Sequence, residues 1–343
     1  MADVLPAELL ADHTTLRVGG PAREFVSAET EADLVEAVRE ADEAGRPVLV
    51  LGGGSNLLVD DAGFDGRVVA VRTTGVRADA DACGGAVVRV AAGESWDALV
   101  ERSVEEGWIG AEALSGIPGL VGATPIQNVG AYGQEVAETI ASVRCWDRQA
   151  GAVRTLFNRD CGFGYRTSRF KADPDRYVVL EVVFQFRLGD LGAPVKYAEL
   201  AGRLGVEPGG RAPAREVREA VLGLRRGKGM VLDPADHDTW SAGSFFTNPV
   251  VAPEDVPEGA PSWPLPDGRA KTSAAWLIEH AGYGRGYGTA RAALSGKHTL
   301  ALTNRGSASA ADLLALAAEV RDGVRERFGI TLVNEPVLVG CAL

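Results

Sequence analysis

The chain has 343 residues, of which 46% are hydrophobic and 24% charged, a composition typical of a globular protein large enough for two or three domains. No apolar run reaches the roughly 18 residues that a membrane-spanning helix needs, and the segment 1–11 is acidic where a signal peptide would be basic. The net charge of −12 argues against a nucleic-acid partner but is compatible with a small anionic ligand held by local cations. We therefore expect a cytoplasmic protein without membrane insertion.

Short apolar or alternating runs predict the strands of the first half of the chain. These runs are 24–28, 47–51, 66–72, 86–93, 143–147 and 177–186. Helices are predicted to begin after Thr30 and after Ser95, because threonine and serine are good N-caps. The second of these helices is expected to run to about Glu106, and a third to cover about 213–226.

The second half of the chain contains a proline-rich segment. Residues 253–268 contain five prolines, which predicts a loop or excursion outside the core. A helix is expected at 271–282, a strand at 299–304 and a long helix at 309–328, where Leu313, Leu316, Val320, Val324 and Phe328 follow helical spacing. A final pair of strands is expected around Glu335. The alternation of elements indicates an α/β or α+β protein with a domain boundary near residue 229.

The cysteines and histidines are scattered along the chain. The four cysteines include no CxxC pair, and the four histidines show no metal-ligand spacing. We expect the cysteines to be small buried residues in a reducing compartment, and we expect neither disulfides nor a metal site. The residues concerned are Cys83, Cys145, Cys161, Cys341, His13, His237, His280 and His298.

A glycine-rich loop follows the predicted strand at 47–51. In "LGGGSN", three consecutive glycines allow the backbone to approach a ligand closely and to turn its N–H groups toward a phosphate or pyrophosphate. A nucleoside triphosphate loop would need Lys-Ser/Thr where Asn56-Leu57 stands, and the dinucleotide pattern fails because Leu57 replaces its third glycine. A cofactor phosphate loop and a tight structural turn both remain compatible with this stretch.

A second glycine-rich loop, "SGIPGLVGATPIQNVGAYG", covers 115–133. It combines glycines and two prolines with isoleucine, valine and leucine, and it carries few charges. A solvated linker would be more polar, so this backbone is expected to pack against something large and flat. Together with the first loop, it suggests a dinucleotide with an extended ring system, such as FAD.

Cations occur in two settings that have different interpretations. Arg166, in "CGFGYRTSRFK", follows Tyr165 and two glycines, which suits either a planar anion or developing enolate, or a surface arginine stacked on an aromatic ring. The segment "LRRGKG" at 224–229 ends a predicted helix with three cations. Such charges complement the C-terminus of a helix, and this structural interpretation is favoured for the segment by itself.

A serine and a glutamate have apolar neighbours. Ser244, in "SAGSFFTNP", lacks the GxSxG elbow and a readable His or Asp partner, which argues against a nucleophile. Its hydroxyl could donate a proton in a site poor in water, although a turn or N-cap serine is favoured by the stretch alone. Glu335 is predicted to be a strand-borne carboxylate between two apolar runs. It is expected to be either partnered or functional, or an ordinary edge-strand residue.

Taken together, six segments resemble the UDP-N-acetylenolpyruvoylglucosamine reductases, the FAD enzymes of peptidoglycan precursor synthesis. The segments are "LGGGSN", "IPGLVGATPIQNVGAYG", "FGYRTSRFK", "GSFFTNP", "AAWLIEHAG" and "NEPVLV". They occur in order from about residue 13 to 340, and "PIQNVGAYG" and "GSFFTNP" are specific to the family. Tyr197, in "VKYAEL", matches the subgroup that has an extra tyrosine-bearing loop.

The resemblance implies an α+β protein with an FAD-binding fold of the vanillyl-alcohol-oxidase type and an α/β substrate-binding domain. Its division of this sequence is lobe 1 of the FAD domain at 1–72, lobe 2 at 73–229, the substrate domain at 230–329 and C-terminal strands returning to the active site at 330–343. The family's behaviour also implies a monomer.

The resemblance implies FAD as the cofactor and places the two glycine loops on it. The first loop is expected on the diphosphate and the loop at 117–133 along the flavin and ribityl chain, while Arg225 matches an arginine near the flavin. The residues so assigned are Gly52, Gly53, Gly54, Ser55, Asn56, Leu57, Pro118, Gly119, Gly122, Ala123, Thr124, Pro125, Asn128, Gly130, Gly133 and Arg225.

The resemblance also implies the reaction. NADPH reduces FAD and leaves, and UDP-N-acetylglucosamine enolpyruvate then takes a hydride from flavin N5. The negative charge that develops on the substrate is stabilised by Arg166, with a protonated Glu335 as a second candidate. Ser244 donates the proton that completes UDP-N-acetylmuramate. Tyr197, Lys228 and Asn248 match residues that bind the substrate.

The sequence departs from the family at one clear position, and two alternative functions are weighed against the reductase. Thr247 stands where many members carry lysine, so the cation of those members is missing, and the neighbours of Arg225 also differ. The alternative enzyme is another flavin oxidase or dehydrogenase of the same fold acting on a hydroxy acid, against which "GSFFTNP" and Tyr197 count. A protein that only binds FAD or a UDP-sugar would not need Arg166, Ser244 and Glu335 together.

Overall fold

The computed structural model describes residues 8–81 and 83–343, and its chain forms two compact units. Unit 1 combines the residues up to Arg23 with Gly54–Asp65 and Gly227–Leu343, and unit 2 contains Glu24–Gly53 and Gly66–Arg226. The predicted division into lobes and a substrate domain stays a prediction. The N-terminal segment in which no signal peptide was expected lies largely outside the described residues.

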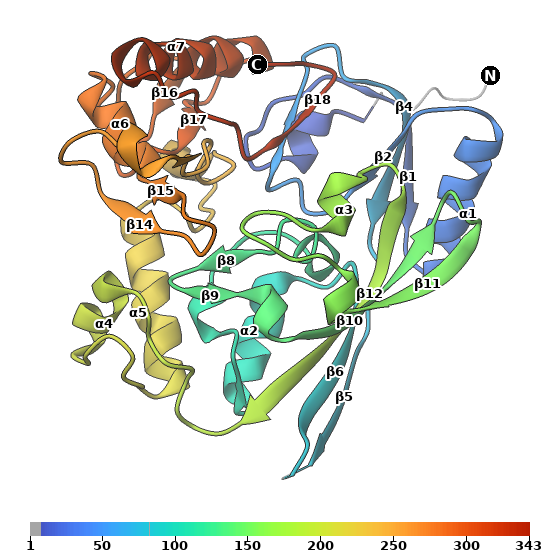
Figure 1. Ribbon diagram of the computed structural model, residues 1–343. Coiled ribbons are helices and arrows are strands. Elements are labelled where there is room, and N and C mark those ends of the chain that lie inside the picture. Colours follow the sequence, from blue (N-terminus) through green and yellow to red (C-terminus); the bar gives the residue numbers. More distant parts are fainter. Residues whose placement is uncertain (1–7, 82) are drawn as a thin grey trace. The chain divides into compact units, whose positions relative to one another are not determined.

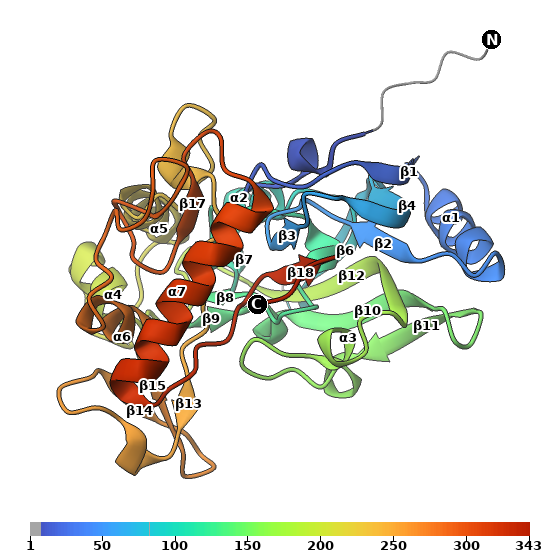
Figure 2. The ribbon, with the colours of Figure 1, turned by 90° about the horizontal axis from the view of Figure 1, so that it is seen from above.

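Unit 2 contains a small sheet covered by a helix. The strands β1 (Ala22–Ala28), β4 (Phe64–Val71) and β2 (Val48–Leu51) lie in the order β1-β4-β2, with β2 and β4 parallel. Helix α1 (Glu31–Glu43) lies beside them (Figure 2). It begins after Thr30 as predicted, because the Thr30 side chain and Asp33 form a capping box.

The larger sheet of unit 2 is antiparallel and has the order β11-β10-β12-β6-β5, with β7 paired to the end of β12 (Figure 1). Its strands are β5 (Val76–Asp81), β6 (Gly85–Ala91), β7 (Trp108–Ile109), β10 (Ile140–Asp147), β11 (Ala152–Phe157) and β12 (Tyr177–Leu188). The core on this sheet includes Phe184 stacked on Phe186 and Trp96 tilted against Phe184. Trp96 opens α2 (Trp96–Glu105), which Ser95 caps as predicted.

Shorter elements connect these parts of unit 2. A two-stranded hairpin, β8 (Gly130–Ala131) and β9 (Gln134–Glu135), ends the second glycine loop. The helices are α3 (Arg169–Ala172), α4 (Ala198–Leu204) and α5 (Ala214–Gly227), of which α5 was predicted. Short 3-10 turns lie at Glu112–Leu114, Val121–Ala123, Val136–Glu138 and Asn158–Asp160.

Unit 1 is built around the long helix α7 (Ala310–Phe328), whose predicted apolar positions are buried except for the last, Phe328, which is partly buried. It packs on α6 (Ala274–His280) and on the antiparallel strands β16 (Ala292–Leu294) and β17 (Leu302–Asn304) (Figure 1). Three strands form a second sheet in the order β13 (Val250–Val251), β15 (Ala270–Thr272) and β14 (Ser262–Pro264). Strand β18 (Val337–Val339) pairs in parallel with β3 (Leu57–Val59). Short 3-10 turns lie at Leu10–His13, His237–Thr239 and Pro253–Asp255.

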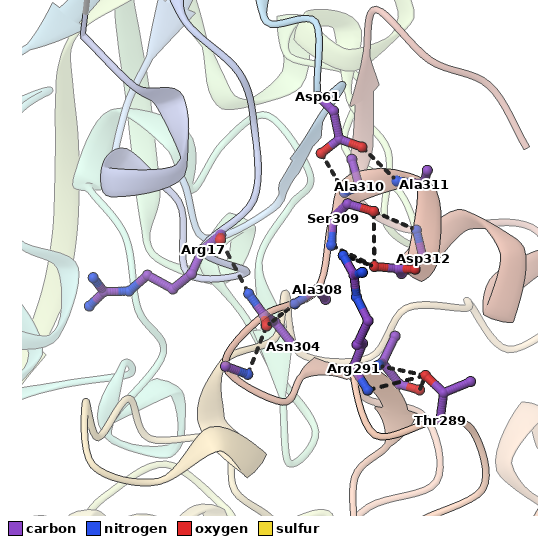
Figure 3. Close-up of polar contacts among 12 residues, drawn as sticks. Arg17, Asp61, Thr289, Arg291, Asn304, Ala308, Ser309, Ala310, Ala311 and Asp312 are labelled. Atoms are coloured by element: carbon purple, nitrogen blue, oxygen red, sulfur yellow. Dashed lines mark hydrogen bonds and ion pairs between the residues drawn. The ribbon is translucent and has the colours of Figure 1, made fainter. Parts of the chain in front are cut away.

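The N-terminus of α7 is capped twice. Ser309 and Asp312 form a capping box, and the Asp61 carboxylate accepts hydrogen bonds from the N–H groups of Ala310 and Ala311 at 2.8 and 3.0 Å (Figure 3). These N–H groups have no partner within a helix, and a carboxylate there also opposes the positive end of the helix dipole. Asp61 thereby ties the residues after β3 to α7.

Several sequence predictions are wrong in detail. The segment 253–268 lies outside the core as predicted, since none of its residues is buried, but it is not entirely a loop, because it contains β14, an edge strand in which a proline is tolerated. The helix expected at 271–282 begins only after Ser273, which caps it, because 270–272 form β15. The strand expected at 299–304 is confined to β17.

The expected pair of strands around Glu335 is also wrong. Only β18 is a strand, and Asn334 makes a single bridge to Phe246. Glu335 therefore does not belong to a strand. Pro336 follows it and has no N–H to continue the ladder, which explains the interruption.

The environment of the cysteines was only partly predicted. All four thiols are free, and Cys145 and Cys161 are buried, whereas Cys83 is exposed and Cys341 is partly exposed. Cys83 is therefore an error of the prediction, since it follows β5 in an exposed turn. Within 8–81 and 83–343, no cluster of three or more potential metal ligands is found. Over the same residues, no helix combines the length and the apolar character that crossing a membrane requires.

Candidate functional site

The two glycine loops meet in unit 2. A Cβ atom placed on Gly53 would lie 2.8 Å from the Cα of Gly119, which leaves no room for a side chain between the two backbones. On Gly52 the nearest atoms, from Leu120 and Ala123, would lie at 3.9 Å. The Trp96 N–H donates a 3.1 Å hydrogen bond to the Gly119 carbonyl and holds the second loop at this point. The loops that the sequence suggested as a pair are therefore in contact, backbone to backbone.

The second loop is also fixed on the large sheet. The N–H of Val121 donates to the Glu94 carbonyl and the N–H of Gly122 to the Ala92 carbonyl, each at 2.8 Å. A Cβ on Gly122 would lie 2.5 Å from that of Ala92, so glycine is required there by packing. The Thr124 hydroxyl donates to the Val121 carbonyl at 2.8 Å. The loop is a built structure rather than a linker.

Arg166 is held against the far end of the same loop. Its Nη2 donates to the Gly130 carbonyl at 2.8 Å, and Lys171 Nζ donates to the Arg166 carbonyl at 3.0 Å. Its guanidinium carbon lies 5.6 Å from the centre of the Tyr165 ring, so the predicted aromatic neighbour is present. The backbone of Arg166 has φ 52°, a left-handed conformation that a non-glycine residue adopts at a cost. This strain marks Arg166 as a candidate functional residue.

Asn128 joins the loop to the Arg166 segment. Its Nδ2 donates to Glu135 Oε2 at 2.8 Å and to the Gly164 carbonyl at 3.1 Å, and its Oδ1 accepts from the Ala137 N–H at 3.1 Å. The side chain is buried and all of its bonds are internal. Asn128, which the sequence placed on the cofactor, therefore shapes the loop through its side chain.

Tyr197 and Arg225 approach the loop through Tyr132. The rings of Tyr132 and Tyr197 meet edge to face with centres 5.6 Å apart, and Tyr197 remains 45% exposed. Arg225, in the last turn of α5, is only 8% exposed, and its burial lowers its pKa against the opposing effects of Tyr132 and Asp97. Arg225 does lie in the last turn of α5, as the interpretation of the 224–229 cations as complements of a helix C-terminus requires, but its side chain is buried.

Two carboxylates that the sequence did not indicate, one half-buried and one buried, hold this region together. Asp97 accepts from the Gly116 N–H and from Arg218 Nη1, both at 2.6 Å. Burial alone would raise the pKa of Asp97, but these hydrogen bonds outweigh it and hold the pKa below its usual range. Asp97 therefore joins the start of the second loop to α5. The sequence offered one signal for this role: Asp97 lies in the first turn of α2, where Ser95 already caps the helix.

The second of these carboxylates, Glu112, is only 1% exposed. It accepts from the Gly110 N–H at 2.7 Å, from Gln134 Nε2 at 3.0 Å and from the Ala193 N–H. Gln134 belongs to β9 at the end of the second loop, and Ala193 precedes the segment that carries Tyr197. Glu112 thus connects these two segments. A glutamate flanked by alanines in "GAEALSG" was the only sequence signal.

In unit 1, the remainder of the first loop runs into β3. Gly54 has φ 61°, and a Cβ there would lie 1.8 Å from the His13 carbonyl oxygen, so only glycine fits. Asn56 accepts from the Val337 N–H at 2.9 Å through its carbonyl, and its Nδ2 donates to the Glu335 carbonyl at 3.3 Å. Ser55 lies between these two residues, and Leu57 begins β3.

Ser244 and Glu335 lie on neighbouring backbone segments of unit 1. The Glu335 N–H donates to the Phe245 carbonyl at 2.8 Å, and the Thr247 N–H donates to the Val333 carbonyl at 3.0 Å. Phe245 and Phe246 are buried in the core around α7, which fixes the position of the half-buried Ser244. No helix begins at Ser244, which excludes the N-cap interpretation. The structure thus brings together two residues that are far apart in the sequence.

The remaining predicted residues of unit 1 have different environments. Asn248 Oδ1 accepts from the Ala274 N–H at 2.9 Å, at the start of α6. Lys228 is half-buried in the turn after α5. The Thr247 hydroxyl donates to the Val333 carbonyl at 3.3 Å. It thereby supports the pairing of 245–247 with 333–335, whereas a lysine at this position would add a positive charge. Arg166, Tyr197 and Arg225 belong to unit 2, while Ser244, Asn248 and Glu335 belong to unit 1.

Comparisons with known proteins match the chain along nearly its whole length. A model of an FAD binding domain matches residues 22–156, and a model of the UDP-N-acetylenolpyruvoylglucosamine reductase C-terminal domain matches 233–339. The chain is 63% identical to a UDP-N-acetylenolpyruvoylglucosamine reductase of Cutibacterium acnes, over 97% of this chain and 90% of that protein. It is 56% identical to the reductase of the same name from Streptomyces coelicolor, with the same coverage. The crystal structure of a UDP-N-acetylenolpyruvylglucosamine reductase from Thermus caldophilus is similar with a TM-score of 0.67 and 28% identity, covering 97% of both chains.

Proposed function

Since the chain belongs to the UDP-N-acetylenolpyruvoylglucosamine reductase family, we propose specific roles for the residues that its two units hold in place. The chain is an FAD-dependent oxidoreductase that reduces UDP-N-acetylglucosamine enolpyruvate to UDP-N-acetylmuramate with NADPH as co-substrate. The expected α+β fold with an FAD-binding domain, FAD as the cofactor and the overall reduction of the sugar nucleotide are confirmed. The roles of individual residues are the proposal.

The glycine loops fit a bound FAD. At Gly53 and Gly119 two backbones meet so closely that no side chain fits between them. A side chain at Gly54 would collide with the His13 carbonyl oxygen. Within the described part of the chain, the N–H groups of Gly53 and Gly54 donate to no acceptor, which leaves them available to a diphosphate. We assign the diphosphate to 52–57, and the flavin and ribityl chain to the loop at 117–133 with Arg225. When bound, FAD supplies the storage and transfer of a hydride.

Three side chains are assigned to the reacting end of the substrate. Arg166 places a cation at the substrate carboxylate, where negative charge develops during reduction, and Glu335, in its protonated form, donates a second hydrogen bond to it. Ser244 Oγ delivers a proton to the carbon next to that carboxylate. The observation that supports these roles best is the pairing of 245–247 with 333–335, because it sets the backbones of Ser244 and Glu335 side by side.

The other assigned residues hold the sugar nucleotide. Tyr197 is exposed and oriented by Tyr132, which suits it to contact a ligand. Lys228 is assigned to an anionic group of the UDP moiety. Asn248 uses its Oδ1 to cap α6, so it would bind the substrate through its Nδ2. We further propose that the enzyme acts as a monomer in the cytoplasm and serves cell-wall synthesis, and therefore cell shape and division. Sedimentation of the purified protein tests the monomer.

The decisive experiment compares NADPH oxidation by the purified flavoprotein with and without UDP-N-acetylglucosamine enolpyruvate. We expect a flavin absorption band and strong stimulation by the sugar nucleotide. Oxidation that responds instead to a hydroxy acid would identify another flavin oxidase or dehydrogenase of this fold. A protein that binds FAD and is not reduced by NADPH would be a binding protein only.

The role of Ser244 is tested by Ser244→Ala. Because the hydroxyl acts after the flavin is reduced, reduction by NADPH should stay nearly unchanged, while reoxidation by the sugar nucleotide should slow by about 10²–10⁴-fold, the usual effect of a general acid. Ser307→Ala, at an exposed serine of the same unit, is the control and should leave both half-reactions unchanged. Equal loss of both half-reactions in Ser244→Ala would make Ser244 a structural residue.

A further inference from the structure

Thr15 connects the first glycine loop to the segment of Ser244. It is 6% exposed, and its hydroxyl donates a 2.7 Å hydrogen bond to the Ser241 carbonyl, while its N–H donates to the Gly54 carbonyl at 3.2 Å. We propose that Thr15 is a positioning residue for proton donation by Ser244, acting through the Ser241 carbonyl. The inference rests on the proposed role of Ser244. It gives a function to a residue that the sequence motifs did not indicate.

The Ser241 carbonyl controls Ser244 because the chain between them is short. The Ser241 hydroxyl accepts from the Gly243 N–H at 3.2 Å, and Gly243 has φ 70°, which forms a tight turn. On the other side of Ser244, the Phe245 N–H donates to the Leu300 carbonyl at 2.7 Å. Ser244 is therefore the half-buried residue between two fixed points. Without the bond from Thr15, the Ser241 carbonyl loses its side-chain donor, and the nearest remaining anchor on that side is the bond from the Asn304 N–H to the Trp240 carbonyl.

The hydroxyl of Thr15 is itself held in a rigid turn. The Thr14 hydroxyl donates to the Val18 carbonyl at 3.1 Å, and the Arg17 N–H donates to the Thr14 carbonyl at 3.3 Å. Asn304 Nδ2 donates to the carbonyl of Arg17, as Figure 3 shows, at 3.2 Å. The N–H of the same asparagine donates to the Trp240 carbonyl at 3.0 Å. Residues 14–18 and 240–241 are thus joined both directly, through Thr15, and through Asn304. The Thr15 hydroxyl is therefore a fixed donor for the Ser241 carbonyl.

The same residue links the proton donor to the cofactor loop. Its N–H contact with Gly54 is a backbone bond that a side-chain change leaves in place, whereas its contact with Ser241 depends on the hydroxyl alone. The two contacts can therefore be separated by substitution. Thr15→Val removes the donor and keeps the shape, and Thr15→Ser keeps the donor. A merely structural threonine would affect stability without favouring one half-reaction.

The control is Thr303→Val. Thr303 is another buried threonine of unit 1, and its hydroxyl donates to a backbone carbonyl, that of Ala293, at 2.8 Å. Its loss removes the same kind of hydrogen bond and should cost similar stability, but it lies in the β16–β17 pair rather than in the turn of Ser244. A difference between Thr15→Val and Thr303→Val therefore reports on position rather than on stability.

The experiment measures each half-reaction of the FAD-loaded variants by stopped flow, and hydrogen–deuterium exchange of the apo protein. In Thr15→Val we expect flavin reduction by NADPH and the FAD dissociation constant to stay within about threefold of the parent. Reoxidation by UDP-N-acetylglucosamine enolpyruvate should slow by about 10- to 100-fold, since a displacement below 1 Å at a reacting group is costly. Exchange in 240–246 should increase. Thr15→Ser should restore reoxidation to within about threefold, and Thr303→Val should change neither half-reaction.

Three results would overturn the inference. They are unchanged reoxidation in Thr15→Val, equal slowing of both half-reactions, or a Thr15→Ser variant no better than Thr15→Val. Each requires that the parent enzyme is stimulated by the sugar nucleotide. If the parent is not stimulated, the proposed function fails, and the exchange of 240–246 still decides whether Thr15 anchors the turn.

Discussion

Replacing Gly53 by alanine should separate the two glycine loops. The added Cβ would lie 2.8 Å from the Cα of Gly119, whereas ordinary contacts begin near 3.4 Å, so the backbones must move apart by at least 0.6 Å. Strain of this kind in a packed region costs about 1–3 kcal/mol. For a unit of this size the melting temperature should fall by about 2–12 °C, at 2–4 °C for each kcal/mol. FAD affinity should fall as well, because the displaced loops are the ones assigned to the cofactor.

Gly52→Ala is the matched control, because its Cβ would meet the nearest protein atoms at 3.9 Å, an ordinary contact distance. The assay is thermal unfolding of the apo proteins, followed by titration with FAD monitored by flavin fluorescence. Gly52→Ala should melt within about 1 °C of the parent, since it adds no strain to the protein. The reasoning is refuted if Gly53→Ala has the same melting temperature as the parent, or if Gly52→Ala is the less stable variant. In either case the backbone contact between Gly53 and Gly119 would not exclude a side chain.

Three further predictions concern groups outside the reaction itself. Glu112→Gln turns an amide toward N–H donors and should lower the free energy of unfolding by about 2 kcal/mol or more, seen as a lower denaturant midpoint. An unchanged midpoint would show that the three hydrogen bonds accepted by Glu112 do not stabilise the fold. A hydrogen bond from Arg176 lowers the pKa of Asp147, so this carboxylate stabilises the fold above its unfolded pKa of about 4, and the stability is lost as pH falls through its lower folded pKa. Asp147→Asn should therefore flatten the stability curve below about pH 4, and a parallel curve would refute this. Burial raises the pKa of Cys145 to about 11, so iodoacetamide at pH 8 should alkylate exposed Cys83 and spare Cys145 in the folded protein, as peptide mass spectrometry can show.

The longest and most periodic elements could be predicted from the sequence. Helix α7 has apolar residues at helical spacing and a serine cap, and β12 is rich in valine, leucine and phenylalanine, so local pattern and burial agree. The short strands were missed or misplaced because pairing partners decide them: β14 forms in a proline-rich stretch since β15 lies beside it. The strand expected before Glu335 fails because the segment bridges to Phe246 at one point only.

The site could be predicted only in part. Residue types and family motifs indicated the glycine loops, Arg166, Ser244 and Glu335, whose individual roles stay proposals. The contacts that hold them could not be predicted. Thr15 reaches a residue 226 positions away, and nothing in "HTTLRVGG" distinguishes the threonine that makes this bond from its neighbour. Long-range hydrogen bonds to backbone carbonyls leave no periodic signal in a sequence.

The way the chain divides between its units sets an order for folding during synthesis. Unit 2 has all of its residues once position 226 has left the ribosome, whereas β3 must wait for β18, which follows later in the chain, in the segment Gly227–Leu343. Until then the two early pieces of unit 1 can bond to each other, but the α7 residues that complete the core around Leu16 and Leu58 are missing, so these leucines stay exposed. Deleting β18 would therefore leave a segment near the beginning of the chain without its strand partner, while the residues of unit 2 would all be present.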